Sequence, residues 1–278
     1  MGTLQGKIVV ITGSTRGFGY ATAQAALQAG AIVVVSGRSQ PALEQAVANL
    51  RSLGKVEGIL CDVSEERQVY ALARRAADRF GRIDVWVNNA GYSASAGMLM
   101  DLPPQQAVDM FLVNDMGTLY GAHAALHFML PLRQGTLVNV YGAGSFLRPS
   151  SPTGLYAATK AWISSITRTL AQELRGSGVK LLGFSPGMLL TEMLTAPTVH
   201  GEAARGPMKN YAFVLRMLAG SPEKAARRLI STVATQRKEF AEVRLFKPWT
   251  PLAGLLRIAW ENVTGTARPP EFELHYEP

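Results

Sequence analysis

The chain has 278 residues, of which 47% are hydrophobic and 17% are charged, and its formal net charge is +8. This is the composition of a globular protein, and the length allows one large α/β domain or two small ones. Its single cysteine, Cys61, excludes an internal disulfide. We find no leader before the first predicted strand and no apolar run of about 18 residues, so we expect a cytoplasmic protein.

Short apolar runs alternate with helical patterns through the first two thirds of the chain. Buried strands without polar alternation, separated by helices, indicate a parallel sheet covered on both faces. Right-handed crossovers between them predict a doubly wound, Rossmann-type α/β fold. The predicted strands are 7–12, 31–36, 56–61, 83–91 with its exit loop, 136–140 and 179–184, and the predicted helices are 20–29, 41–53, 65–80, 103–131 and 156–174.

The last third of the chain is less regular. A helix at 222–236, a strand at 239–246 and an apolar helix at 251–260 are predicted, and the chain from about residue 264 is expected to be extended or mobile. We predict a single domain over 1–278, with a lid region at 187–220 on the substrate side and a C-terminal extension at 247–278. The lid region could cover an apolar substrate or be ordinary core. It contains four methionines, Met188, Met193, Met208 and Met217.

The sequence TGSTRGFG at residues 12–19 lies between the first strand and the first helix. Glycines there allow the backbone to approach a pyrophosphate, and the following helix supplies unpaired N–H groups. The second strand ends at Ser36-Gly37-Arg38, without the acid that binds the ribose 2′-hydroxyl of NAD. Because Arg16 and Arg38 could both contact a 2′-phosphate, we predict NADP(H) as the cofactor. His123 and His127 have a helical spacing that could suit a metal, but no third ligand is evident nearby, so we expect no metal site.

Tyr156 and Lys160 lie four residues apart on a predicted helix, so their side chains face the same way. A free tyrosine has a pKa of about 10, and a nearby ammonium is expected to lower it. The phenol could then protonate the alkoxide that forms when a carbonyl accepts a hydride.

Several motifs occur in one order along the chain: TGSTRGFG, NNAG at 88–91, Tyr156-x-x-x-Lys160, and Pro186-Gly187 followed by Thr191. Together they resemble the short-chain dehydrogenase/reductase family. The resemblance implies that Asp62 contacts adenine, that Asn88 steadies the sheet, that Thr191 holds the nicotinamide carboxamide and that Lys160 holds the ribose hydroxyls. It also implies a proton-relay water at Asn114. The expected cofactor-binding residues are Gly13, Ser14, Thr15, Arg16, Gly17, Phe18, Gly19, Arg38, Asp62, Val63, Asn89, Ala90, Gly91, Tyr156, Lys160, Pro186, Gly187 and Thr191.

The carbonyl-binding serine of that family has no counterpart, because its position falls on Gly142 or Ala143. Ser145 is the nearest hydroxyl and is the candidate for this catalytic role. Tyr141, a backbone N–H of the Gly-Ala-Gly turn, or no replacement at all are also possible, since an oxyanion needs only preorganised donors.

The motif NxxGAGS before YxxxK, with SPGMLLTEML after it, resembles a narrower branch, the chlorophyll b reductase-like proteins. The segments IDVWVNNAG and TPLAGLLRIAW resemble it too. This resemblance implies an NADPH-dependent carbonyl reductase that converts the C7 formyl group of chlorophyll(ide) b to hydroxymethyl. A short-chain ketone or alcohol oxidoreductase with an unrelated substrate, and a non-catalytic NADP-binding protein, are the competing hypotheses.

The expected partner is an apolar carbonyl or alcohol substrate. Basic residues gather between Lys224 and Arg257, but no nucleic-acid motif accompanies them, so we expect no nucleic-acid partner. That region could contact a membrane peripherally or simply be a solvated surface, and the helix at 251–260 could lie on a membrane, on the enzyme itself or on a second subunit. By analogy with the family, we expect a homodimer or homotetramer formed through the helices at 103–131 and 156–174.

Overall fold

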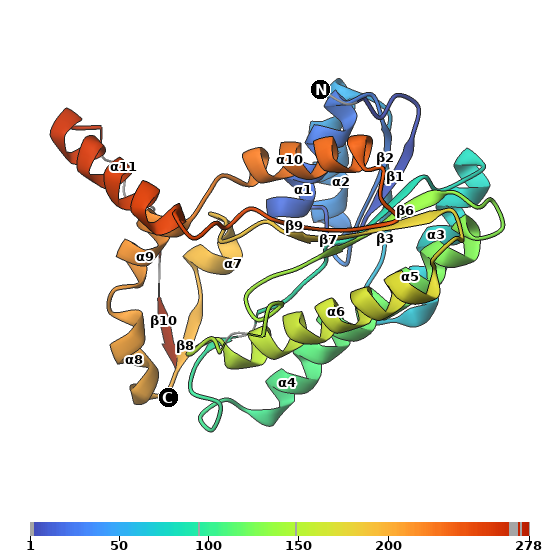
Figure 1. The fold of residues 1–278 in the computed structure, drawn as a ribbon. Coiled ribbons are helices and arrows are strands. Elements are labelled where there is room, and N and C mark those ends of the chain that lie inside the picture. Colours follow the sequence, from blue (N-terminus) through green and yellow to red (C-terminus); the bar gives the residue numbers. More distant parts are fainter. Residues whose placement is uncertain (1–2, 94, 148, 267–271, 273, 278) are drawn as a thin grey trace.

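The computed structural model describes residues 3–93, 95–147, 149–266, 272 and 274–277. Within these residues, seven parallel strands form one sheet in the order β3-β2-β1-β4-β6-β7-β9 (Figure 1). The chain order changes direction at β1, which pairs with β2 on one side and with β4 on the other. The expected doubly wound, Rossmann-type α/β fold is therefore confirmed. The strands are β1 (Ile8–Ile11), β2 (Ile32–Gly37), β3 (Val56–Leu60), β4 (Val85–Asn88), β6 (Gly135–Val140), β7 (Val179–Ser185) and β9 (Phe240–Arg244).

Helices cover both faces of this sheet (Figure 1). Apolar side chains of β1, β2, β4, β6 and β7 pack on both sides, which explains why these strands show no polar alternation. On one side they contact α1 (Gly17–Gln28), α2 (Gln40–Leu50) and α10 (Pro222–Thr235). On the other side they contact α3 (Glu66–Phe80), α5 (Gly117–Met129) and α6 (Gly154–Glu173).

The helix predicted at 103–131 is not α-helical throughout. It consists of α4 (Pro104–Phe111), a π-helical turn at Leu112–Met116 and α5. Such a turn accommodates one extra residue, and it frequently occurs at functional sites. Here it contains Asn114, whose backbone oxygen accepts a hydrogen bond of 2.6 Å from Thr118 Oγ1. The helical periodicity of the sequence does not reveal this local widening.

The lid region at 187–220 contains a strand as well as helices. Beside α7 (Glu192–Thr195), α8 (Glu202–Met208) and α9 (Tyr211–Leu218) lies β8 (Thr198–His200). This strand lies between β5 (Ser95–Ala96) and β10 (His275–Glu277) in a small parallel sheet. The sheet therefore ties the lid region to the loop after β4 and to the end of the chain. The rest of the predicted C-terminal extension includes 267–271, 273 and 278, which lie outside the described residues.

The last helix, α11 (Thr250–Thr264), is longer than predicted and projects away from the body of the molecule (Figure 1). Its contacts are chiefly with α9 and not with the central sheet. In the part of the chain that the structure describes, none of the helices combines the length and apolarity needed to cross a membrane.

Candidate active site

A cavity of about 920 Å³ lies beyond the carboxyl ends of the central strands β1, β2, β4, β6 and β7. This is the edge at which doubly wound folds bind their ligands. All of the predicted cofactor-binding residues except Ser14 line it. Four segments that are distant in sequence therefore line the same cavity. They are the glycine loop, the end of β2, the Tyr156-Lys160 pair and the Pro186-Gly187 turn.

The glycine loop before α1 has a shape that only glycine permits. Gly13 has a φ of +60°, and a Cβ there would lie 2.8 Å from Ala90 Cα. A Cβ on Gly19 would lie 2.4 Å from both Asn89 Nδ2 and Gly13 O. The backbone is thus exposed to the cavity at the N-terminus of α1, an arrangement that fits the pyrophosphate of a dinucleotide.

Ser14 does not take part in this cradle. Its side chain is fully buried, donates to Ile11 O at 2.7 Å and accepts from Ser36 N at 2.9 Å. The prediction of Ser14 as a cofactor ligand is therefore wrong for its side chain, because the hydroxyl ties the loop to β2.

The end of β2 presents Arg38 to the cavity as an exposed cation. Arg16, from the glycine loop, also borders the cavity and forms an exposed ion pair with Glu192 of α7. Asp62, at the end of β3, accepts hydrogen bonds from the backbone N–H and the hydroxyl of Ser64, at 3.0 and 2.7 Å. The wall that would hold an adenosine therefore carries two guanidiniums and one oriented carboxylate.

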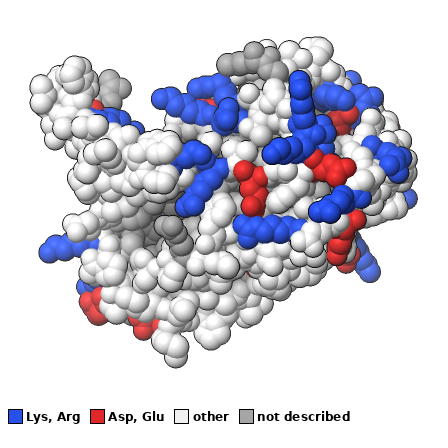
Figure 2. Space-filling model, in the orientation of Figure 1, with Lys and Arg blue, Asp and Glu red and all other residues white. Residues whose placement is uncertain are grey.

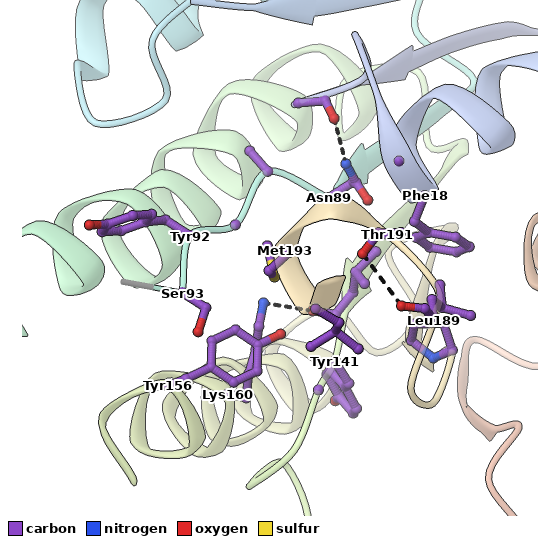
Figure 3. Close-up of a pocket in the computed structure, with 18 of the residues that line it drawn as sticks. Phe18, Asn89, Tyr92, Ser93, Tyr141, Tyr156, Lys160, Leu189, Thr191 and Met193 are labelled. Atoms are coloured by element: carbon purple, nitrogen blue, oxygen red, sulfur yellow. Dashed lines mark hydrogen bonds between the residues drawn. The ribbon is translucent and has the colours of Figure 1, made fainter. Parts of the chain in front are cut away.

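Tyr156 and Lys160 project from α6 into the cavity side by side (Figure 3). Lys160 Nζ lies 5.5 Å from the centre of the Tyr156 ring and donates to Val140 O at 3.4 Å. Burial lowers the pKa of Lys160 to about 8, against the opposing influence of the Asp115 carboxyl. Lys160 is therefore mostly an ammonium at neutral pH.

The pKa of Tyr156 shifts in the direction opposite to the one expected from the sequence. Burial raises the pKa of Tyr156 to about 12, because the surrounding protein disfavours the tyrosinate. At neutral pH the residue is consequently a phenol, which is the proton-donating form.

Ser145 cannot serve as the carbonyl-binding hydroxyl in this arrangement. Its side chain is fully buried, donates to Lys160 O at 2.8 Å and accepts from Gly142 N at 3.2 Å. The hydroxyl thus fixes the turn against α6 and does not reach the cavity. The prediction of Ser145 as a catalytic residue is contradicted by these contacts.

Tyr141 and the backbone of the Gly-Ala-Gly turn differ in the donors that they present to the cavity. The Tyr141 hydroxyl donates to Glu242 Oε1 at 3.1 Å, and its ring occupies the space beside Gly183, so the hydroxyl is used elsewhere. Ala143 and Gly144 line the cavity, and among the described residues neither of their N–H groups has an acceptor. Of these candidates, the backbone of the turn therefore has unused donors in residues that line the same cavity as Tyr156.

Asn114 supports the site without lining the cavity. Its Nδ2 donates to Tyr92 O at 2.9 Å and to Thr159 Oγ1 at 3.0 Å, and its Oδ1 accepts from Tyr92 N at 2.7 Å. Its side chain therefore joins the loop after β4 to α6. A comparable role belongs to Asn88, whose Nδ2 donates to Asn139 Oδ1 at 2.9 Å and to Thr118 O at 3.1 Å within the central sheet and α5.

The opposite wall of the cavity is largely apolar, and most of it was not identified from the sequence. The Met-rich pattern pointed to Met188 and Met193, which do line the cavity, whereas Met208 is buried in the small core around β8. Met208 is therefore ordinary core, whereas a substrate-covering role for Met188 and Met193 remains a prediction. The further lining residues include Tyr92, Ser93, Phe146, Leu189, Leu194, Tyr211, Leu218 and Phe246.

Comparison with known proteins agrees with this geometry. The family model for short chain dehydrogenases matches residues 7–199. An uncharacterized oxidoreductase of Staphylococcus epidermidis is 34% identical over 212 residues, which cover 76% of this chain and 90% of that protein. Chlorophyll(ide) b reductase NOL of rice, Oryza sativa subsp. japonica, is 38% identical over 203 residues. That match covers 70% of this chain but only 59% of the rice protein.

Solved structures share the fold. A metagenomic short-chain oxidoreductase in complex with NADP is 25% identical, with a TM-score of 0.70 over 87% of this chain and 96% of that one. A short chain dehydrogenase/reductase from Burkholderia phymatum in complex with NAD is 26% identical, with a TM-score of 0.76 over 97% of this chain and 98% of that one. Structural neighbours thus bind either dinucleotide.

Proposed function

The chain belongs to the short-chain dehydrogenase family of oxidoreductases, and we propose that it is an NADPH-dependent carbonyl reductase with Tyr156 as the acid. The observation that carries this proposal is the Tyr156-Lys160 pair on α6, which projects into a cavity bordered by the glycine loop. Tyr156 is a phenol at neutral pH, so it holds the proton that the reductive direction requires.

Three groups of the chain would act on the carbonyl: the Tyr156 hydroxyl, the Lys160 ammonium and the backbone N–H groups of the Gly-Ala-Gly turn. When bound, NADPH supplies the hydride that the carbonyl carbon accepts. The Tyr156 hydroxyl gives its proton to the oxygen of that carbonyl, and the Lys160 ammonium stabilises the tyrosinate that remains. The N–H groups of Ala143 and Gly144 would polarise the same oxygen, in place of the missing serine hydroxyl.

The preference for NADPH rests on Arg38 and Arg16, because guanidiniums form strong charge-assisted hydrogen bonds to phosphate. We predict that Arg38→Asp will move the preference toward NADH, since a carboxylate repels a 2′-phosphate and binds a 2′-hydroxyl. The ratio of kcat/KM for the two cofactors should change by about 100-fold or more in steady-state kinetics. Arg79→Asp on α3, an exposed cation remote from the cavity, is the control. A wild-type enzyme that prefers NADH would refute the assignment.

The proposed substrate is the C7 formyl group of a chlorophyll(ide) b-type tetrapyrrole. Support comes from the similarity to the rice reductase and from the apolar wall formed by Met188, Met193 and Leu194. Methionine side chains adapt to large flat surfaces. Because the rice protein is much longer than the matched region, its activity is carried to this chain only as a proposal.

The test is NADPH oxidation with chlorophyllide b, compared with a panel of simple aldehydes, cyclic ketones and acyl-chain ketones. Turnover of chlorophyllide b with product carrying a hydroxymethyl group supports the tetrapyrrole assignment. Turnover of simple carbonyls alone would favour a general carbonyl reductase, the second candidate, which the match to nearly the whole S. epidermidis oxidoreductase supports.

Tyr156→Phe provides the matched control for the mechanism. The substitution removes only the hydroxyl, so we expect kcat to fall by about 1000-fold or more while the Kd for NADPH, measured by fluorescence titration, stays within about twofold. Retained turnover would exclude Tyr156 as the acid. Binding of NADPH without turnover of any carbonyl by the wild-type chain would instead support a non-catalytic NADP-binding protein.

A further inference from the structure

Helix α11 carries a row of large apolar side chains that the rest of the described chain leaves uncovered. Their exposed fractions lie between 45% and 84%. With 100° between successive residues, those within the helix fall on one side of it. We call this surface the α11 face; it consists of Trp249, Leu252, Leu255, Leu256, Trp260 and Val263.

The opposite side of α11 is held firmly. Ile258 is buried, and a Cβ on Gly254 would lie 2.0 Å from Met217 O, so the backbones of α11 and α9 are in close contact. Arg216 Nη2 of α9 also pairs with Glu261 Oε2 at 3.1 Å. The helix thus has a packed side and an exposed side, and the apolar residues occupy the exposed one.

We propose that the α11 face docks onto an anionic lipid surface, with the helix lying in the plane of the membrane. A contiguous apolar surface of this kind is unusual on a protein surrounded by water and marks an interaction site. Trp249 and Trp260 border the face near its two ends, and tryptophan favours the boundary between lipid and water. A helix of 15 residues with one apolar side is suited to lie in that boundary.

The charges around the helix favour lipid over a purely apolar partner. Lys247 precedes the face and is exposed. Arg257 flanks the face and is also exposed, and it forms an ion pair with Glu261 at 3.7 Å. Figure 2 shows many Lys and Arg side chains, with some Asp and Glu among them, on the upper part of the molecule, beside the largely uncharged end that projects at the upper left. Apolar contact with basic surroundings is the combination that binds anionic membranes. The basic region between Lys224 and Arg257 would therefore attract the anionic lipid, and the α11 face would make the main contact with it.

Docking would also affect the cavity, because α9 links the two. Tyr211 and Leu218 of α9 line the cavity, while Met217 of the same helix contacts α11. A docked α11 would bring the apolar wall of the cavity close to the lipid, where an apolar substrate accumulates. This last step rests on the proposed reductase function, whereas docking itself can be measured without any turnover.

The experiment is co-sedimentation of the full chain with vesicles of phosphatidylcholine, with or without phosphatidylglycerol. We expect binding to the anionic vesicles, weakened by salt, and a loss of about tenfold or more in partitioning for Leu256→Glu combined with Trp260→Glu. Leu132→Glu, which alters an exposed leucine in the turn after α5, should bind like the wild type. Thermal unfolding of each variant verifies that the fold is retained.

A second measurement locates the contact. Brominated lipids should quench the fluorescence of the wild-type chain, and most of this quenching should disappear when Trp249 and Trp260 are replaced by Phe. Of the two tryptophans that remain, Trp86 is fully buried, and Trp162 lies on α6, where it is partly buried against Phe111. Absence of vesicle binding overturns the proposal. Binding that the Leu256→Glu, Trp260→Glu variant retains also overturns it. Self-association that the same variant abolishes, without vesicle binding, would identify the face as a contact between two copies of the chain.

Discussion

Gly142 is one of the two positions at which the resemblance to the family would place a serine, and it lies close to Tyr156. A Cβ at this position would lie 2.7 Å from Tyr156 Oη and 2.9 Å from Lys160 Cγ. Neither atom tolerates so close an approach, so a side chain here would displace the phenol. The glycine is therefore part of the arrangement that positions Tyr156.

We predict that Gly142→Ala lowers kcat by about 100-fold, because a shift of about 1 Å in a reacting group has an effect of that size. Gly142→Ser should be impaired to a similar degree, although it restores the residue typical of the family. Gly206→Ala is the control, since its Cβ would meet nothing within 4 Å. A gain of activity in Gly142→Ser would show that the site lacks a hydroxyl donor and that the backbone N–H groups do not replace it.

At the scale of elements, the π-helical turn between α4 and α5 places a carboxyl near the site, which no pattern in the sequence indicated. Asp115 is almost fully buried, and its Oδ1 has no hydrogen-bond partner within the described residues. Burial raises the pKa of Asp115 to about 7, although Lys160 opposes the increase. The carboxyl therefore titrates close to neutral pH, near the lysine of the site.

The raised pKa has a defined consequence for stability. The folded chain holds the Asp115 proton up to about pH 7, whereas an unfolded aspartate releases it near its ordinary pKa of 3.8. The folded state thus binds more protons between these values, so stability falls as the pH rises through this range. We predict that Asp115→Asn, which resembles the protonated acid, is more stable than the wild type by about 2–4 kcal/mol at pH 8, with the difference vanishing near pH 4.

Urea unfolding at a series of pH values measures this difference. Asp78→Asn, which alters an exposed aspartate of α3, should show no comparable dependence. The same Asp115→Asn change should lower the pKa of Lys160, because the Asp115 charge raises it. A stability difference that does not vary with pH would mean that Asp115 is already neutral, or already charged, across the whole range.

At the scale of the whole molecule, the small sheet joins the end of the chain to the cavity. β10 pairs with β8 at Thr198, Val199 and His200, and β8 lies between α7 and α8 in the lid region. Since α7 contributes Met193 and Leu194 to the cavity, the C-terminal strand supports the wall opposite Tyr156.

The expected homodimer or homotetramer remains a prediction.

We predict that a chain ending at residue 271, which lacks β10, has a KM for the carbonyl substrate raised by about threefold to tenfold. The Kd for NADPH should change less than KM, because β10 pairs with β8 and, among its described residues, contributes none to the cavity that the glycine loop and Arg38 border. Tyr276→Ala keeps the strand and should leave KM near the wild-type value. An unchanged KM in the shortened chain would show that β8 holds its position without β10.

The sequence alone determined the fold class and the oxidoreductase family, since both depend on local patterns. Apolar runs separated by helices specify a parallel sheet, and a glycine loop after the first strand specifies the phosphate cradle. The spacing of Tyr156 and Lys160 places both on one helix face whatever surrounds them. These features need only the residues within one element or one turn.

Only the tertiary structure decided which side chains face the cavity and what burial does to them. The sequence suggested Ser145 as the carbonyl-binding residue. In the structure, however, its hydroxyl donates to Lys160 O and accepts from Gly142 N. The pKa of Tyr156 rises, where the sequence predicted a fall, because desolvation depends on every element packed around α6. The exposure of α11 likewise depends on where its neighbours lie, and no pattern within the helix records that.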